Sequence, residues 1–182
     1  ARTIERKVYA LLESNPTLAD GIALFHASHG NLSDTSDAIS VAALDAARSA
    51  MAQQKAPGDD QEYLDIQPAV SVCHTGKRST MQVTVNAEYD PDTANKLQKP
   101  NAVRGIVADI VSSPRLSSAT AWYLFADPSM APVIEVVFLN GQREPRIVEE
   151  ESFRTGGLSW RIEMPFGVGA IDYRGAYKNL GA

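Results

Sequence analysis

The spacing of apolar residues changes along the chain, from a helical period near its start to strand-like segments in its second half. Four apolar side chains of the first segment fall at i, i+4, i+7 and i+8: Ile4, Val8, Leu11 and Leu12. This spacing places them on one face of a helix, which Asn15-Pro16 then ends. The chain therefore opens with an amphipathic helix.

A second helix is predicted for the Ala-rich residues 41–55. Ser40 is suited to be its N-cap, and Lys55 is placed in its last turn, where a cation favours the negative end of the helix. Pro57-Gly58 stops the pattern.

The second half of the chain is rich in branched and aromatic residues, which favour strands. Four such segments, separated by Pro or Gly, are residues 103–111, 120–127, 132–139 and 158–164. Asn140-Gly141 predicts a turn before a further extended piece, residues 146–151. Residues 62–73 favour entry into a strand, whereas residues 75–91 fit either a helix or a strand that carries Met81, Val83 and Val85 on one face. Helices first and strands later predict an α+β fold with helices packed on a sheet.

Composition excludes several classes of protein. With 182 residues, 44% of them hydrophobic, the chain can bury a core, and its net charge of −5 argues against a protein that grips phosphate backbones. No apolar run approaches the roughly 20 residues that cross a bilayer, and no signal peptide is evident, so we expect a cytoplasmic protein. Alanine at position 1 suggests that the chain starts inside a longer gene product.

The segment "HASHG" places His26 and His29 three residues apart, with Gly30 after them. Two imidazoles could share a metal ion, but a catalytic zinc usually takes three protein ligands, and the usual helical motif spaces its histidines by four. A third ligand could be His74, Asp20 or Cys73, and the sequence selects none of them. We therefore predict that this segment shapes a loop through hydrogen bonds to the backbone.

Other chemical candidates are weaker. Ser28 lies in no G-x-S-x-G elbow. Cys73, the only cysteine, precedes His74 directly, and a strand would send the two side chains to opposite faces, so we expect a buried, inert thiol. Three consecutive carboxylates, residues 149–151, cannot all converge on one cation from an extended chain and are expected to be a solvated edge.

The C-terminal glycines and aromatics likewise point to structure rather than chemistry. The glycines of residues 167–175 lack the lysine and hydroxyl of a phosphate loop, so no cofactor is expected. The segment "DYRGAYK" predicts a strand and tail whose aromatic rings pack, with Arg174 and Lys178 at the rim.

Six segments, in this order, together resemble the major head subunit of Mu-like tailed phages and prophages: residues 18–32, 42–55, 62–68, 122–128, 132–145 and 166–179. The resemblance implies the Hong Kong 97-like capsid fold, with the amino-terminal arm and extended loop of that fold missing here. Residues 1–30 would then form the end of the spine helix and the following loop of a peripheral domain. Residues 31–145 would form an axial-type α/β domain, and residues 146–182 strands and a tail that return to the peripheral domain.

The same resemblance implies a structural protein that assembles into hexamers and pentamers of an icosahedral shell around DNA. It implies self-association, partners such as scaffold, prohead protease and portal proteins, and residence in the virion or, during assembly, in the host cytoplasm. It implies no membrane partner, no sequence-specific nucleic acid binding and no catalytic, cofactor or metal residue. The alternative is a hydrolase, either metal-dependent through His26, His29 and His74 or a fragment of a fused head-maturation protease. An enzyme would gather those histidines around one pocket, and a capsid subunit would scatter them.

Overall fold

A computed structural model describes residues 2–58, 61–91, 99–152, 154 and 156–182. Its helices are α1 (Arg2–Ser14), α2 (Val41–Ala52) and α3 (Arg78–Asn86), with 3-10 turns η1 (Ala27–His29), η2 (Thr75–Lys77) and η3 (Leu139–Gly141). Its strands are β1 (Pro68–His74), β2 (Asp109–Ser113), β3 (Trp122–Ala126), β4 (Ile134–Phe138), β5 (Arg146–Ser152), β6 (Gly157–Glu163), β7 (Phe166–Ala170) and β8 (Ala176–Asn179). The mixed α+β class predicted from the sequence is confirmed. No helix of the described residues is long and apolar enough to cross a bilayer.

Both predicted N-terminal helices are present. The side chain of Ser40 accepts a hydrogen bond from the amide of Ala43 and caps α2, as predicted. The helix ends at Ala52, however, so the placement of Lys55 in its last turn was wrong. Lys55 instead forms an antiparallel bridge with Tyr63, a pairing that a residue in a helical turn does not make.

The ambiguous residues 75–91 contain the turn η2 and the helix α3. Met81 and Val85 of α3 are buried, whereas Val83 is 55% exposed, so the three do not share a face as they would in a strand. The amide of Asn101 closes the end of this helix by donating to the carbonyl oxygens of Thr84 (2.7 Å) and Ala87 (2.9 Å). A residue far along the chain thus satisfies carbonyl groups that a helix end leaves free.

A four-stranded sheet in the order β2-β1-β3-β8 forms the centre of the body. Strands β1 and β2 are parallel, and β3 runs antiparallel to both β1 and β8. Alternate residues face opposite sides, so Trp122 and Leu124 of β3 lie on one side while Tyr123 and Phe125 lie on the other.

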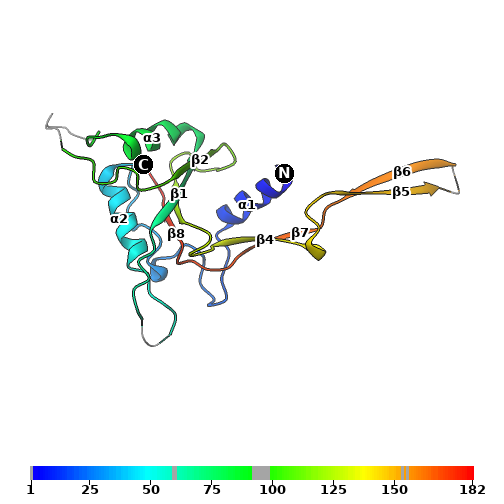
Figure 1. Ribbon diagram of the computed structural model, residues 1–182, viewed down its shortest axis with the longest axis horizontal. Helices are drawn as coiled ribbons and strands as arrows, with labels where there is room; N and C mark the ends of the chain where they lie inside the picture. Colours follow the sequence, from blue (N-terminus) through cyan, green and yellow to red (C-terminus); the bar gives the residue numbers. More distant parts are fainter. Residues whose placement is uncertain (1, 59–60, 92–98, 153, 155) are drawn as a thin grey trace.

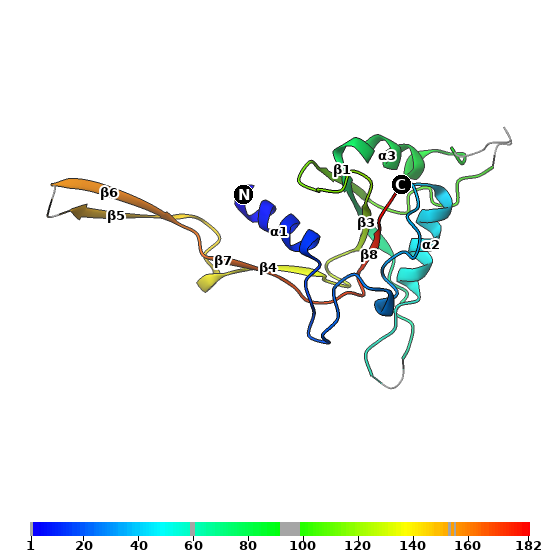
Figure 2. The same ribbon diagram turned by 180° about the vertical axis from the view of Figure 1, so that it is seen from behind.

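Each side of this sheet buries its own apolar cluster. On the side of Trp122 the sheet packs against α2 and α3, through residues such as Leu44 and Met81. On the side of Tyr123 it packs against Leu12 of α1 and the loop that contains Phe25. The body therefore has three layers, which can be followed in Figure 1 and, from behind, in Figure 2.

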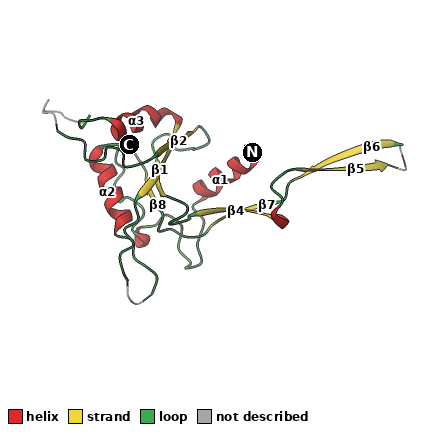
Figure 3. Cartoon of the chain, viewed as in Figure 1, coloured by secondary structure: helices red, strands yellow, loops and turns green. Residues whose placement is uncertain are grey.

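A narrow β ribbon extends from this body. Its proximal part is the antiparallel pair β4 and β7, and its distal part is the antiparallel pair β5 and β6. All three ribbon diagrams show the β5–β6 pair projecting beyond α1, away from the sheet (Figures 1, 2 and 3). The predicted strands in residues 132–139, 146–151 and 158–164 are confirmed, as is the turn at Asn140-Gly141.

Two strands differ from the sequence-based expectation. Of residues 103–111 only the last three belong to a strand, since β2 begins at Asp109. Val103 and Val107 are buried in the irregular segment before it. Strand β7 was not predicted, since two of its five residues are glycines, and it exists through its ladder with β4. Glycine weakens a strand locally, so this pairing depends on the partner strand.

Candidate functional site

The histidine segment forms the turn η1. The imidazole Nδ1 of His26 accepts a hydrogen bond from the amide of Ser28 (3.1 Å), and Gly30 ends the turn at φ 64°, in the left-handed region that favours glycine. The prediction that "HASHG" shapes a loop is confirmed.

His29 is the buried member of the pair, with only 7% of its surface exposed. Its Nε2 lies 2.8 Å from the Asp20 carboxylate, and its Nδ1 lies 3.3 Å from the carbonyl oxygen of Leu24. Its ring stacks on that of Tyr173, as predicted for a packed C-terminal aromatic. A hydrogen bond from the Ile22 amide and the contact with His29 lower the pKa of Asp20. Both ring nitrogens therefore have partners inside this chain.

Asn31 joins the same loop to the C-terminal segment. It is fully buried, and its side chain accepts from the amide of His26 (3.0 Å) and donates to the carbonyl oxygens of Leu24 (2.7 Å) and Tyr173 (3.3 Å). Gln54, which follows α2, donates to the carbonyl oxygen of His29 (2.9 Å). These bonds hold the loop in one conformation and leave its polar groups satisfied.

His74 lies on a different turn from the other two histidines. It ends β1, and its Nδ1 accepts from the amide of Gly76 at the start of η2 (3.2 Å). Cys73 faces the buried cluster, and burial raises the pKa of its thiol, which agrees with the predicted inert cysteine. Across the ranges that the structure describes, no group of three or more His, Cys, Asp or Glu side chains is placed to hold a metal ion.

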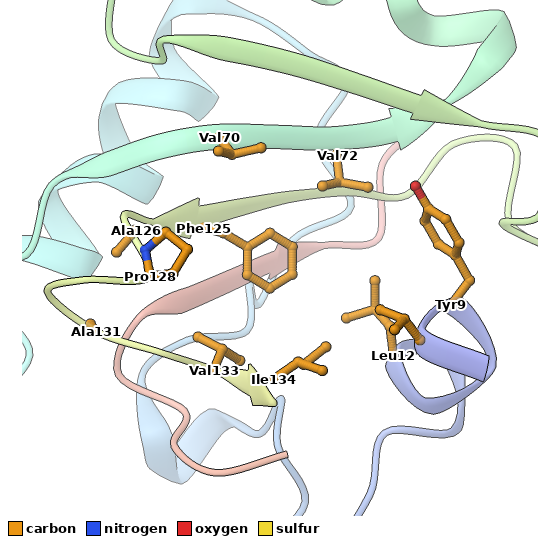
Figure 4. Close-up of a pocket in the computed structure, with 11 residues that line it drawn as sticks. Tyr9, Leu12, Val70, Val72, Phe125, Ala126, Pro128, Ala131, Val133 and Ile134 are labelled. Atoms are coloured by element: carbon orange, nitrogen blue, oxygen red, sulfur yellow. The ribbon is translucent and has the colours of Figure 1, made fainter. Parts of the chain in front are cut away.

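An apolar cavity of about 270 Å³ lies where α1 and the start of β4 meet the sheet. Figure 4 shows that its lining comes from three directions: Tyr9 and Leu12 from α1, Val70, Val72 and Phe125 from the sheet, and Val133 and Ile134 from the β4 segment. The side chains that line it carry no charge. It suits an apolar side chain, and the Tyr9 hydroxyl is the one polar side-chain group among its lining residues.

One face of the distal ribbon is apolar and open to solvent. Because β5 and β6 pair in antiparallel register, directly opposed residues point to the same face. One face carries Ile147 opposite Ile162, Glu149 opposite Trp160, and Glu151 opposite Leu158. Its four large apolar side chains, called the apolar ribbon face below, are exposed by 53% to 71%: Ile147, Leu158, Trp160 and Ile162.

The opposite face of the ribbon carries two ion pairs within the chain. The carboxylate of Glu163 forms ion pairs with both Arg146 and Arg161, and its Oε2 lies 3.0 Å from Nη2 of Arg146. On the apolar side, Glu149 and Glu151 form no ion pair with any residue that the structure describes. The ribbon thus presents apolar side chains together with carboxylates that no described residue neutralises.

The sequence indicated part of this surface. The exposed carboxylates of residues 149–151 are confirmed as a solvated edge. The branched and aromatic residues of 158–164 predicted the strand, but a half-buried strand normally covers a core with its apolar side. No signal in the sequence indicates that both faces of the pair are uncovered, because that depends on where the rest of the chain lies.

Comparison with known proteins gives a family match over nearly the whole chain: residues 1–179 match the family described as "Phage capsid protein". No curated protein matches. Among solved structures, a chain of "Satellite phage P4 procapsid including size determination (Sid) protein" is 14% identical, with a TM-score of 0.36. The match covers 81% of this chain and 40% of that chain, so this chain spans less than half the length of the solved one.

Proposed function

The chain belongs to the phage capsid protein family. On that premise we propose that it is a capsid subunit of a phage head and that it binds copies of itself through its projecting ribbon. The observation that carries this proposal is the apolar ribbon face. A two-stranded ribbon alone in water is marginally stable at best, and it gains stability when an apolar side is covered. Four large apolar side chains gathered on one exposed surface are typical of a protein–protein interaction site.

The finer proposal follows the family resemblance. We propose the Hong Kong 97-like fold, with peripheral residues 1–30, axial-type residues 31–145 and returning residues 146–182. The helix α1 beside the β4–β7 pair, next to a sheet with helices on it, supports this arrangement. In the sheet pairings, β4 joins β7 and β8 joins β3, so the proposed axial and returning segments interlock.

We further propose that the subunits form hexamers and pentamers of an icosahedral shell that encloses DNA. Scaffold, prohead protease and portal proteins are the proposed partners, and the host cytoplasm is the proposed place of assembly before the protein resides in the virion. The net charge of −5 supports a container that does not adhere to its DNA. The proposal assigns no catalytic, cofactor or metal residue to this chain.

The test is assembly of the full-length protein, measured by light scattering during size-exclusion chromatography and by electron microscopy. We expect rings or shells from the wild type. Trp160→Ser should abolish them without unfolding the subunit, because Trp160 is 64% exposed and aromatic anchors dominate interfaces.

Met130→Ser is the matched control, since Met130 is 70% exposed in the turn before β4. This variant should assemble like the wild type. A wild-type protein that stays monomeric at every concentration, both alone and with the proposed scaffold, protease and portal proteins, would contradict the proposed function.

A further inference from the structure

A second apolar groove runs along α1, on the side that faces β7. It measures about 620 Å³, and its apolar lining includes Leu11 of α1 and Phe166 and Val168 of β7. Lys7 lies at its rim. This groove, called the α1–β7 groove below, differs from the uncharged cavity of Figure 4, which lies between α1 and the sheet.

The exposed cations of α1 are available to a partner. Arg6 and Lys7 are exposed and form no ion pair with any described residue. Glu149 and Glu151 of the apolar ribbon face are likewise without an ion pair in the described ranges. The carboxylates thus accompany one apolar surface, and Lys7 lines an apolar groove on another part of the subunit, with Arg6 beside it in α1. The two surfaces are complementary in charge.

The two surfaces also agree in length. The lining residues of α1 run from Thr3 to Ser14, which at 1.5 Å per residue is roughly 16 Å of helix. The apolar side of β6 runs from Leu158 to Ile162, which at 3.3 Å per residue is roughly 13 Å of strand.

We propose that the apolar ribbon face of one copy seats in the α1–β7 groove of a second copy, with Glu149 and Glu151 opposite Lys7 and Arg6. The inference rests on the proposed function and names the surface that the ribbon binds. Because the two surfaces differ, each copy can donate its ribbon to one neighbour and receive the ribbon of another, which is the kind of heterologous contact that generates rings and lattices. Packing two ribbons face to face would instead bring the carboxylates of both copies together, and like charges across an interface disfavour association.

Charge reversal in the full-length protein tests this pairing. Lys7→Glu and Glu149→Lys should each raise the protein concentration needed for assembly about fivefold, since each replaces an attraction with a repulsion. The double variant restores opposite charges at every contact and should return that concentration to near the wild-type value.

Arg104→Glu and Glu62→Lys are the matched controls, because both residues are exposed, lie outside the two surfaces and change the net charge by the same amounts. Both controls should assemble as the wild type does. Cysteine pairing gives a second readout: with dissolved oxygen as the oxidant, mixed Lys7→Cys and Glu149→Cys proteins should form a disulfide between chains, and the buried Cys73 should not react.

Assembly by the wild type that is insensitive to both reversals, with no disulfide in the mixture, would overturn this inference alone. Disulfide dimers from Glu149→Cys by itself, together with an unaffected Lys7→Glu protein, would show face-to-face ribbons and would also overturn it. A wild type that never assembles would overturn the proposed function as well, so the two failures are distinguishable.

Discussion

The imidazole of His29 lies flat on the ring of Tyr173, with centroids 3.7 Å apart and planes 2° from parallel. The guanidinium of Arg174 stands 4.7 Å from the centroid of the Tyr173 ring. A loop near the start of the chain is thereby joined to the segment that leads into β8. Of the three histidines that suggest metal chemistry in the sequence, His26 and His29 both form hydrogen bonds within this loop.

Replacing His29 with alanine should lower the free energy of unfolding by about 2–3 kcal/mol, because a buried ring, its stacking and two hydrogen bonds are lost together. Urea denaturation measures this change. His74→Ala is the matched control and should cost about 0.5–1 kcal/mol, since it removes one turn-capping bond. Equal losses in the two variants would refute the structural role of His29.

Asp20 should give the protein an acid-dependent stability. The pKa of Asp20 is lowered below its ordinary value of 3.8, chiefly by the Ile22 amide and then by His29. A lowered folded-state pKa contributes stability that is present above about pH 4 and is lost as the pH falls through the folded value. The difference in unfolding free energy between wild type and Asp20→Asn should therefore be larger at pH 5 than at pH 3. A constant difference would contradict this.

Gly175 should tolerate no side chain. A methyl group there would overlap the carbonyl oxygen of Ala131, which is backbone and cannot rotate away. Gly175→Ala should therefore cost about 1–3 kcal/mol in unfolding free energy, as overpacking does. Gly169→Ala in β7 is the control, because its new methyl group would meet nothing within 4 Å, and it should be neutral or slightly stabilising. Thermal unfolding measures the stability of both variants, and equal stabilities would contradict the prediction.

Tyr123 should make the fold sensitive to alkali. Burial, helped by the charge of Glu13, raises the pKa of Tyr123 to about 12. A raised folded-state pKa contributes stability that is complete below pH 10 and is lost as the pH rises towards 12. Between pH 8 and pH 11.5 the wild type should lose about 1–2 kcal/mol more stability than Tyr123→Phe.

Tyr63→Phe is the control for this titration, because Tyr63 is 63% exposed. It should lose stability with pH just as the wild type does. Identical pH profiles for Tyr123→Phe and the wild type would show that Tyr123 does not titrate as its burial requires.

Features that depend on a few neighbouring residues could be predicted. Helix α2 begins after Ser40 because a hydroxyl can cap the first free amides, and the loop at His26 turns at Gly30 because glycine accepts a positive φ. The end of α2 was predicted too late, since the bridge between Lys55 and Tyr63 lies outside any helical pattern.

The candidate binding surfaces were predicted only in part. The three carboxylates of residues 149–151 are exposed, as the sequence indicates, but alternate residues of β5 separate Glu150 from the other two. No sequence pattern indicated that Trp160 belongs to a binding surface. Its neighbours on that surface come from the pairing of β5 with β6, which the alternation of one strand does not specify.

The sequence by itself determined the α+β class, the caps and turns, the buried cysteine and the resemblance to a phage head subunit, because local backbone preferences and residue order carry that information. Only the tertiary structure decided that α3 is a helix closed by Asn101, that β8 joins β3, and that β4 pairs with β7 so that β5 and β6 project alone. Those outcomes depend on contacts between residues far apart in the chain. Their energies compete only once the whole chain is folded, so no short window of residues contains them.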